Sequence, residues 1–277
     1  MSLSVIVTAA GSSRRMGGIN KLLLNLKGKP VLIRTLEKFA GQSFVDNIVI
    51  TAPKDLVDKY RELCSNFNIE KICAVVEGGK ERQDSIFAAL KVLQDKGCHY
   101  VAVQDAARPL TSENLIAKLY LGMLRRKNNF ASEVMNDKES YEEWIAMEDS
   151  LNESDPSDSD DLWESELLEK KSDVVGVIPG VAVKDTIKRV GESGFVEETL
   201  NRSELQAVQT PQIFDYKVLM EAYCSAFKDG FVGTDDASLV ERIGRKVLVV
   251  PGEYTNFKIT TVDDIPLAAQ FIGEDRA

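Results

Sequence analysis

Residues 4–26 read SVIVTAAGSSRRMGGINKLLLNL, and this stretch decides the expected fold. The apolar run 5–7 is typical of a strand that is covered on both faces in a parallel sheet. Such sheets bind ligands at the carboxyl ends of their strands, where this chain places small residues, glycines, two arginines and Lys21. A bare backbone with three cations suits a triphosphate. The spacing matches neither the P-loop nor the dinucleotide fingerprint, so a solvated turn remains the alternative.

The composition is ordinary for a globular protein. Of the 277 residues, 44% are hydrophobic and 28% are charged. No apolar run approaches the roughly 18 residues of a membrane span, and the amino terminus lacks the basic region of a signal peptide. The four cysteines are far apart and form no CxxC pair, which favours reduced thiols. We therefore expect a cytoplasmic protein with no membrane partner.

The formal net charge of −10 is concentrated in one segment. Residues 131–170 contain 15 acidic residues against two lysines, a net charge of −13, so the other 237 residues carry a net +3. A mildly basic body suits a protein that binds small polyanions. No large basic stripe is present, and a nucleic-acid partner is therefore not expected.

Strands and helices alternate through the first half of the chain. After the first strand, the patterns predict strands at 45–52, 71–79 and 99–105 and helices at 31–41, 53–67, 82–94 and 111–127. This alternation predicts an α/β fold with a doubly wound, mostly parallel sheet and right-handed crossovers.

The alternation stops at residues 128–172, which are acidic and rich in serine. Their composition favours a disordered or loosely packed insertion of unknown partner, although Trp144 and Trp163 leave a docking surface open. A strand is predicted at 172–180, followed by a protruding β-arm at 181–208. Helices at 216–230, 235–244 and 261–272 and a strand at 245–253 complete the expected order.

Three strands are followed by charged and polar residues at the same edge of the predicted sheet. The first strand is followed by the loop 11–21, the third by Arg82 and Ser85, and the fourth ends at Asp105 with Arg108 nearby. Each segment alone could be a helix start or a turn. The single histidine, His99, precedes the fourth strand at the opposite end, which excludes a Ser-His-Asp triad and a multi-histidine metal site. Phosphoryl-type transfer needs neither of these.

Seven motifs then identify a family. In chain order they are TAAGSSRRMGGINK, GGKERQDSI, DAARP, VKDTIKR, TLNRSELQAVQTPQIF, GTDDASLVE and NFKITTVDDI. Together they resemble the 2-C-methyl-D-erythritol 4-phosphate cytidylyltransferases of the non-mevalonate isoprenoid pathway, over the whole chain except the acidic insertion. The resemblance implies one Rossmann-like nucleotidyltransferase domain over 1–277, which joins CTP to a sugar-alcohol phosphate and releases pyrophosphate. It also implies Mg²⁺, carried mainly by the CTP phosphates, and a homodimer formed through the β-arm.

The resemblance also implies roles for individual residues. Catalysis is expected from Arg15, Lys21, Arg202 and Lys258. CTP is expected to bind Ala9, Ala10, Gly11, Gly79, Arg82, Ser85, Ala106 and Arg108. The sugar-alcohol phosphate is expected to bind Asp105, Thr186, Arg202, Thr234 and Lys258, with Thr186 and Arg202 reaching across from the partner's arm.

Two residues depart from the family pattern, and two rival functions remain. Ser13 stands where the family often has glycine, and Gln104 where histidine is common. One rival is a cytidylyltransferase that acts on ribitol 5-phosphate, against which Ala107 is a weak indicator. The other rival is an inactive nucleotide-binding scaffold that uses its acidic insertion to dock.

Overall fold

The computed structural model describes residues 2–11, 20–124 and 174–273. The predicted acidic insertion and the predicted catalytic Arg15 lie outside these ranges, as does Ser13. The free thiols of Cys64, Cys73, Cys98 and Cys224 agree with the expected reduced state. Within the described ranges, none of the helices has the length and apolar character needed to cross a membrane.

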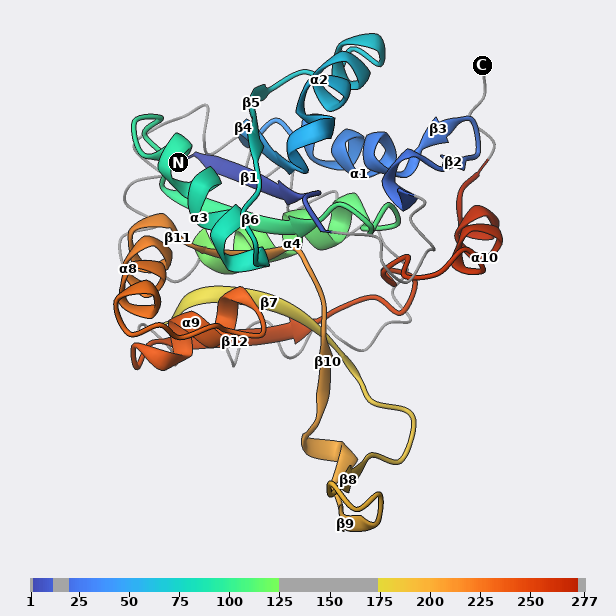
Figure 1. Cartoon of the computed structure of the whole chain (residues 1–277), viewed down its shortest axis with the longest axis vertical. Helices are drawn as coiled ribbons and strands as arrows, with labels where there is room; N and C mark the ends of the chain where they lie inside the picture. Colours follow the sequence, from blue (N-terminus) through green and yellow to red (C-terminus); the bar gives the residue numbers. More distant parts are fainter. Residues whose placement is uncertain (1, 12–19, 125–173, 274–277) are drawn as a thin grey trace.

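An eight-stranded mixed sheet forms the centre of the molecule (Figure 1). Its parallel half consists of β5 (Ile72–Glu77), β4 (Val45–Ala52), β1 (Leu3–Thr8) and β6 (Tyr100–Asp105), paired in this spatial order. The other half contains β11 (Gln212–Asp215), β7 (Val174–Ala182), β12 (Lys246–Pro251) and β10 (Gln206–Val208). The predicted α/β fold with a mostly parallel sheet is confirmed.

Two strands of this sheet, β10 and β11, were not predicted as part of it. β11 runs antiparallel between β6 and β7, with Ile213 opposite both Ala102 and Val177. β12 runs parallel to β7, and β10 pairs antiparallel with the end of β7. β11 therefore joins the half of the sheet that precedes the acidic insertion to the half that follows it.

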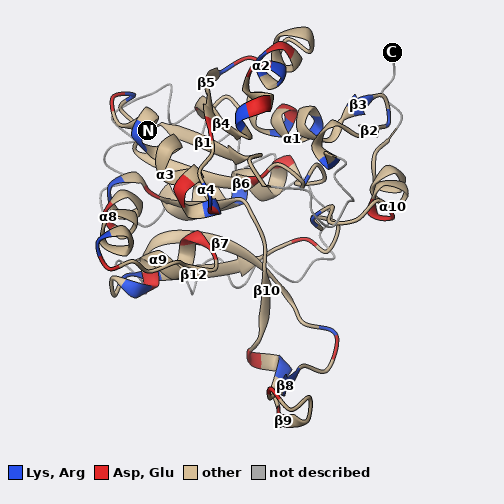
Figure 2. Ribbon diagram, viewed as in Figure 1, with Lys and Arg blue, Asp and Glu red and all other residues tan. Residues whose placement is uncertain are grey.

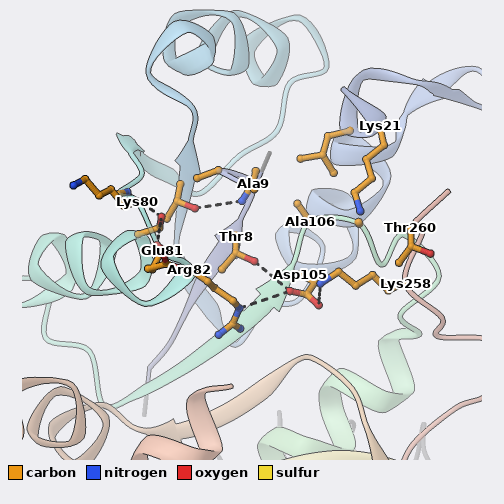
Figure 3. A pocket seen from close by; sticks show the side chains of 17 residues that line it. Thr8, Ala9, Lys21, Lys80, Glu81, Arg82, Asp105, Ala106, Lys258 and Thr260 are labelled. Atoms are coloured by element: carbon orange, nitrogen blue, oxygen red, sulfur yellow. Dashed lines mark hydrogen bonds and ion pairs between the residues drawn. The ribbon is translucent and has the colours of Figure 1, made fainter. Parts of the chain in front are cut away.

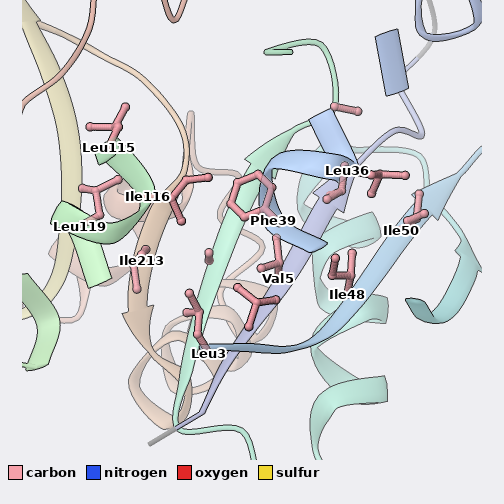
Figure 4. Packing of buried hydrophobic residues seen from close by; sticks show 14 of the residues in the cluster. Leu3, Val5, Leu36, Phe39, Ile48, Ile50, Leu115, Ile116, Leu119 and Ile213 are labelled. Atoms are coloured by element: carbon pink, nitrogen blue, oxygen red, sulfur yellow. The ribbon is translucent and has the colours of Figure 1, made fainter. Parts of the chain in front are cut away.

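Helices cover both faces of the sheet, and the strand residues alternate between them. One core receives Leu3, Val5 and Val7 of β1, whereas Ile6 of the same strand belongs to the other core. This period of two is the geometry of an extended strand and explains the continuous apolar run. The first core is packed by α1 (Val31–Ala40) and α4 (Glu113–Leu124), as Figure 4 shows, and by α2 (Val57–Asn66). The second is packed by α3 (Arg82–Leu93), α8 (Tyr216–Lys228) and α9 (Asp236–Arg242).

Charged residues are largely confined to the outer elements. In Figure 2 the strands at the centre are mostly tan, and the lysines, arginines and acidic residues lie on helices, loops and the hairpin. The four parallel strands β1, β4, β5 and β6 share one direction, so their carboxyl ends meet at one edge. That edge is where the predicted charged groups converge.

Residues 181–208 project from the sheet as an arm (Figure 1). Its tip is a two-stranded hairpin of β8 (Lys188–Val190) and β9 (Val196–Thr199), followed by a short 3-10 turn, η5 (Arg202–Glu204). β10 then returns to β7. The remaining elements of the described residues are smaller: η2 (Lys21–Leu23), the hairpin β2 (Asn25–Leu26) with β3 (Lys29–Pro30), η3 (Lys54–Leu56) and α10 (Asp264–Phe271).

Candidate functional site

A cavity of about 730 Å³ opens at the carboxyl ends of the parallel strands, and we call it the strand-end cavity (Figure 3). The sequence-predicted site residues that line it are Ala9, Ala10, Gly11, Lys21, Gly79, Arg82, Ser85, Asp105, Ala106 and Lys258. They come from four segments that are far apart in the chain. The parallel sheet brings them together because it aligns the ends of β1, β5 and β6.

Close backbone packing shapes one wall of this cavity. A Cβ atom on Gly78 would lie 2.3 Å from the Cβ of Ala10, so the loop after β5 reaches the loop after β1 only because it has no side chain there. The Ser85 hydroxyl accepts the Gly79 N–H at 3.0 Å and donates to the Glu81 carbonyl at 3.2 Å. These bonds hold the loop against the start of α3. The wall suits a ligand that approaches the backbone.

Helix α3 begins with a capping box between Glu81 and Asp84. The Asp84 carboxylate accepts the Glu81 N–H at 3.0 Å, and the Glu81 side chain accepts the backbone N–H of Asp84 in return. The expected helix start and the expected ligand loop are therefore the same segment. The helix start is confirmed, and the ligand-binding role of this segment stays a prediction.

Asp105 is the centre of the charged part of the cavity. Its carboxylate lies 2.9 Å from Lys258 Nζ, 3.5 Å from Arg108 Nε and 4.0 Å from Arg82 Nε. We call these four residues the Asp105 cluster. Burial alone would raise the pKa of Asp105, but the cations more than offset it and hold the pKa below the ordinary value. Asp105 is therefore a carboxylate at neutral pH, paired on several sides.

Arg82 is also tied to a second carboxylate. Its Nη2 lies 2.6 Å from Oδ2 of the fully buried Asp236, whose Oδ1 accepts the Tyr223 hydroxyl at 2.6 Å. Burial opposes the charge of Arg82, yet Asp236 and Asp105 raise its pKa, so it stays a cation. Burial next to Asp236 raises the pKa of Tyr223 as well, and the phenol stays protonated. Asp236, the first residue of α9, therefore fixes the position of the Arg82 guanidinium beside the cavity.

Lys21 contacts the short segment of chain that carries Lys258. Lys21 Nζ donates to the Ile259 carbonyl at 2.6 Å, and the Ile259 N–H donates to the Ala107 carbonyl at 2.8 Å. Lys258 immediately precedes Ile259 and reaches Asp105. Lys21, which is expected to act in catalysis, therefore lies close to Lys258, which is expected to bind the sugar-alcohol phosphate.

The lining carries more positive than negative charge. Four of the residues around the cavity are Lys or Arg and two are Asp or Glu, a formal excess of two positive charges. One of the two carboxylates is already paired within the Asp105 cluster. A cavity of this kind attracts polyanions such as phosphate esters.

Several predicted site residues do not line this cavity. Arg108 is partly buried against Asp105 and donates to the Asn256 carbonyl at 2.6 Å. Thr186 and Arg202 lie exposed on the arm, where Arg202 donates to the Lys184 carbonyl at 2.9 Å. Thr234 is exposed just before α9. His99, as predicted, lies exposed at the amino end of β6.

Other lining residues were not predicted: Thr8, Leu22, Thr51, Lys80, Glu81, Ala107 and Thr260. Thr8 and Thr51 lie at the ends of β1 and β4, so the rule that ligands gather at strand ends could have identified them. The Thr8 hydroxyl lies 3.4 Å from the Asp105 carboxylate. Thr260 has no comparable local signal, because its position depends on the return of a distant loop.

Comparison with known proteins gives one consistent result. The family model for 2-C-methyl-D-erythritol 4-phosphate cytidylyltransferase (IspD) matches residues 3–136 and 158–274. Cytidylyltransferases of that name from Symbiobacterium thermophilum and Bacillus mycoides are 39% and 36% identical. These alignments cover 99% and 97% of this chain, and 94% and 97% of the respective relatives.

Solved structures agree with the sequence relatives. The 4-diphosphocytidyl-2C-methyl-D-erythritol synthase of Anaerococcus prevotii superposes with a TM-score of 0.71 at 28% identity, covering 98% of this chain and 95% of that one. The Francisella tularensis 2-C-methyl-D-erythritol 4-phosphate cytidylyltransferase superposes with a TM-score of 0.69 at 27% identity, covering 98% of this chain and all of that one.

Proposed function

The chain belongs to the 2-C-methyl-D-erythritol 4-phosphate cytidylyltransferase family, and we propose that its strand-end cavity performs that family's reaction. The enzyme transfers the cytidylyl group of CTP to 2-C-methyl-D-erythritol 4-phosphate and releases pyrophosphate, a step in isoprenoid precursor biosynthesis. The observation that carries this proposal is the meeting of the close-packed loops after β1 and β5 with Lys21 and Lys258 in one cavity.

In the proposed arrangement CTP lies along the loops after β1 and β5. Ala9, Ala10, Gly11, Gly79, Ser85 and Ala106 provide the wall, and Arg82 faces it with its position fixed by Asp236. Lys21, together with Arg15 from outside the described residues, holds the triphosphate. Arg108, which was predicted to contact CTP, would act at one remove by supporting Asp105.

The chemical step needs positioning and charge more than a base. A phosphate oxygen of the sugar-alcohol phosphate attacks the α-phosphorus of CTP and forms a new P–O bond. The bond from the α-phosphorus to the oxygen that bridges it to the β-phosphorus breaks, and pyrophosphate leaves with that electron pair. Lys21, which bonds to the Ile259 carbonyl, and Lys258, which precedes Ile259 in the chain, would stabilise the charge on the two reacting phosphates.

The Mg²⁺ in this proposal is carried by the phosphates. The described residues contain no group of three or more His, Cys, Asp or Glu placed to hold a metal ion, and Asp105 is already paired with cations. The donor set therefore fits an ion bound mainly to CTP. When bound, it would neutralise charge on the phosphates.

The proposal includes a homodimer in which the arm completes the partner's site. Thr186 and Arg202 lie on the arm outside the lining of their own strand-end cavity, and Phe195 at the arm's tip is 77% exposed. A large apolar side chain on a projecting hairpin suits burial against another surface. The cytoplasmic location expected from the sequence also belongs to this proposal, in keeping with four free cysteines.

One assay tests the function directly. Purified protein with CTP and Mg²⁺ should release pyrophosphate with 2-C-methyl-D-erythritol 4-phosphate far faster than with ribitol 5-phosphate. The reverse preference would identify the ribitol enzyme. No release with either substrate, from protein shown to be folded, would support the scaffold alternative.

A further inference from the structure

Asn256 is a completely buried amide close to the Asp105 cluster but outside the lining of the cavity. Its Oδ1 accepts the Thr111 hydroxyl at 2.9 Å, and its Nδ2 donates to the Thr210 carbonyl at 3.0 Å and to Gln209 Oε1 at 3.3 Å. Its backbone carbonyl accepts the Arg108 guanidinium at 2.6 Å. One residue thus joins three segments of the chain.

These bonds act on two cations of the Asp105 cluster. Arg108 is bound directly by the Asn256 carbonyl, and Lys258 lies two residues further along the same loop. Thr210, which Asn256 holds, also accepts the backbone N–H of Asp105 at 3.0 Å through its hydroxyl. Asn256 therefore constrains the anion and two of the cations around it.

The same residue reaches the base of the arm. Gln209 follows β10 directly and forms a second pair of bonds with this loop, from its Nε2 to the Glu253 carbonyl at 2.7 Å and from the Glu253 N–H to its Oε1 at 3.3 Å. Tyr254 adds a bond from its hydroxyl to the Ala182 carbonyl at 2.8 Å, at the outgoing side of the arm. The loop that carries Lys258 is thus fastened to both sides of the arm's base.

From these contacts we infer that Asn256 is a positioning residue for the sugar-alcohol phosphate. It fixes the positions of Lys258 and Arg108 beside Asp105. It also fixes the position of the base of the arm relative to these residues, and it contacts neither substrate. The inference rests on the proposed function, because Lys258 and Asp105 are the residues assigned there to the second substrate. No contact of Asn256 described above involves the wall assigned to CTP, so the two substrates should respond differently to its loss.

Steady-state kinetics of Asn256→Ala test the inference. The substitution leaves the buried Thr111, Thr210 and Gln209 groups without this partner and frees the loop that carries Lys258. We expect the KM for 2-C-methyl-D-erythritol 4-phosphate to rise about tenfold or more, while the KM for CTP stays within about twofold. Thr111→Val keeps the shape of the side chain and removes the bond to Asn256, together with the contacts of the Thr111 hydroxyl with the Arg108 carbonyl and Gln104 Nε2. It should raise the same KM about threefold.

Tyr216→Phe provides the matched control. Its hydroxyl is buried and donates to the Leu90 carbonyl at 2.9 Å, away from the strand-end cavity, so the variant loses a buried hydrogen bond without disturbing the site. It should lower the melting temperature and leave both KM values unchanged. A purely structural role for Asn256 would make its variants behave like this control.

Two outcomes are kept apart by this design. If the wild-type protein releases no pyrophosphate, the proposed function itself fails. If the wild-type protein is active but Asn256→Ala and Thr111→Val change both KM values equally, or change neither, only the positioning role is overturned. Should Asn256→Ala fail to fold, Thr111→Val alone decides between these results.

Discussion

Strand β6 and the arm both carry predicted site residues, but the chain supports them in opposite ways. All six residues of β6 are buried, and the strand pairs with β1 on one side and β11 on the other before it ends at Asp105. All seven residues of β8 and β9 are exposed, and in the described part of the chain these strands pair only with each other. A two-stranded hairpin of this kind is marginal by itself.

The contrast teaches where each residue can act. Asp105 has a position that the chain determines by itself, since packing on both faces and pairing on both edges leave it little freedom. Among the described residues, a short turn and one bond from its guanidinium to a backbone carbonyl orient Arg202. Its proposed role therefore depends on a second surface, which the partner's site would supply. The following experiments test this division between a self-supported cavity and a partner-supported arm.

The largest effect is expected at the cavity. Lys21→Ala removes a cation proposed to stabilise the charge that develops on the phosphates, and turnover should fall on the order of 10³-fold or more. The melting temperature should change little, because Lys21 is only partly buried. Single-turnover kinetics and thermal unfolding measure the two effects. Near-normal turnover would remove Lys21 from the catalytic assignment.

The next effect tests whether the arm acts in its own chain or in a partner. Arg202→Ala alone should reduce turnover about 100-fold, since it deletes one charge-assisted contact to a reacting substrate. Mixing this variant with Lys21→Ala should restore activity, because a mixed dimer contains one site with both residues intact. If each site were built from one chain, the mixture would stay inactive. Subunit exchange has to be verified independently, for example with two affinity tags.

A moderate effect is expected on stability and its pH dependence. The folded-state pKa of Asp105 lies below its ordinary value of 3.8, so the ionised carboxylate contributes stability above about pH 4. That contribution is lost as the pH falls through the lowered pKa. Asp105→Asn should therefore destabilise the protein at pH 7, by about 2 kcal/mol, and by less as the pH drops below 4. Urea unfolding of both proteins at pH 7 and at a pH below 4 measures this difference in stability. An equal loss at both would contradict it.

The smallest effect is expected from replacing residues 131–170 with a short Gly/Ser linker. This segment lies outside the described residues, and its net charge of −13 over 40 residues disfavours a core of its own. Loop-closure entropy changes only slowly with length, so turnover should stay within about twofold of the wild-type value. The pI should rise well above 4.9. A large loss of activity would show that this segment supports the site.

Much of the cavity follows from the sequence alone. The apolar run of β1 predicted a strand covered on both faces, and the alternation of strands with helices predicted parallel strands with a shared carboxyl edge. From that edge the small residues 9–11, Lys21, Ser85 and Asp105 could be assigned to one site, and they line one cavity. Local periodicity sufficed here because each strand ends next to its own functional loop.

Tertiary structure alone decided which partners hold these residues. Arg82 pairs with Asp236, 154 positions away, and Asn256 joins Thr111, Gln209 and Arg108. The insertion of β11 between β6 and β7 likewise depends on pairing across the sheet. Hydrophobic periodicity records which face of an element is buried, but it carries no information about which distant polar group a buried side chain meets. Those contacts form only when the folded sheet brings the distant segments together.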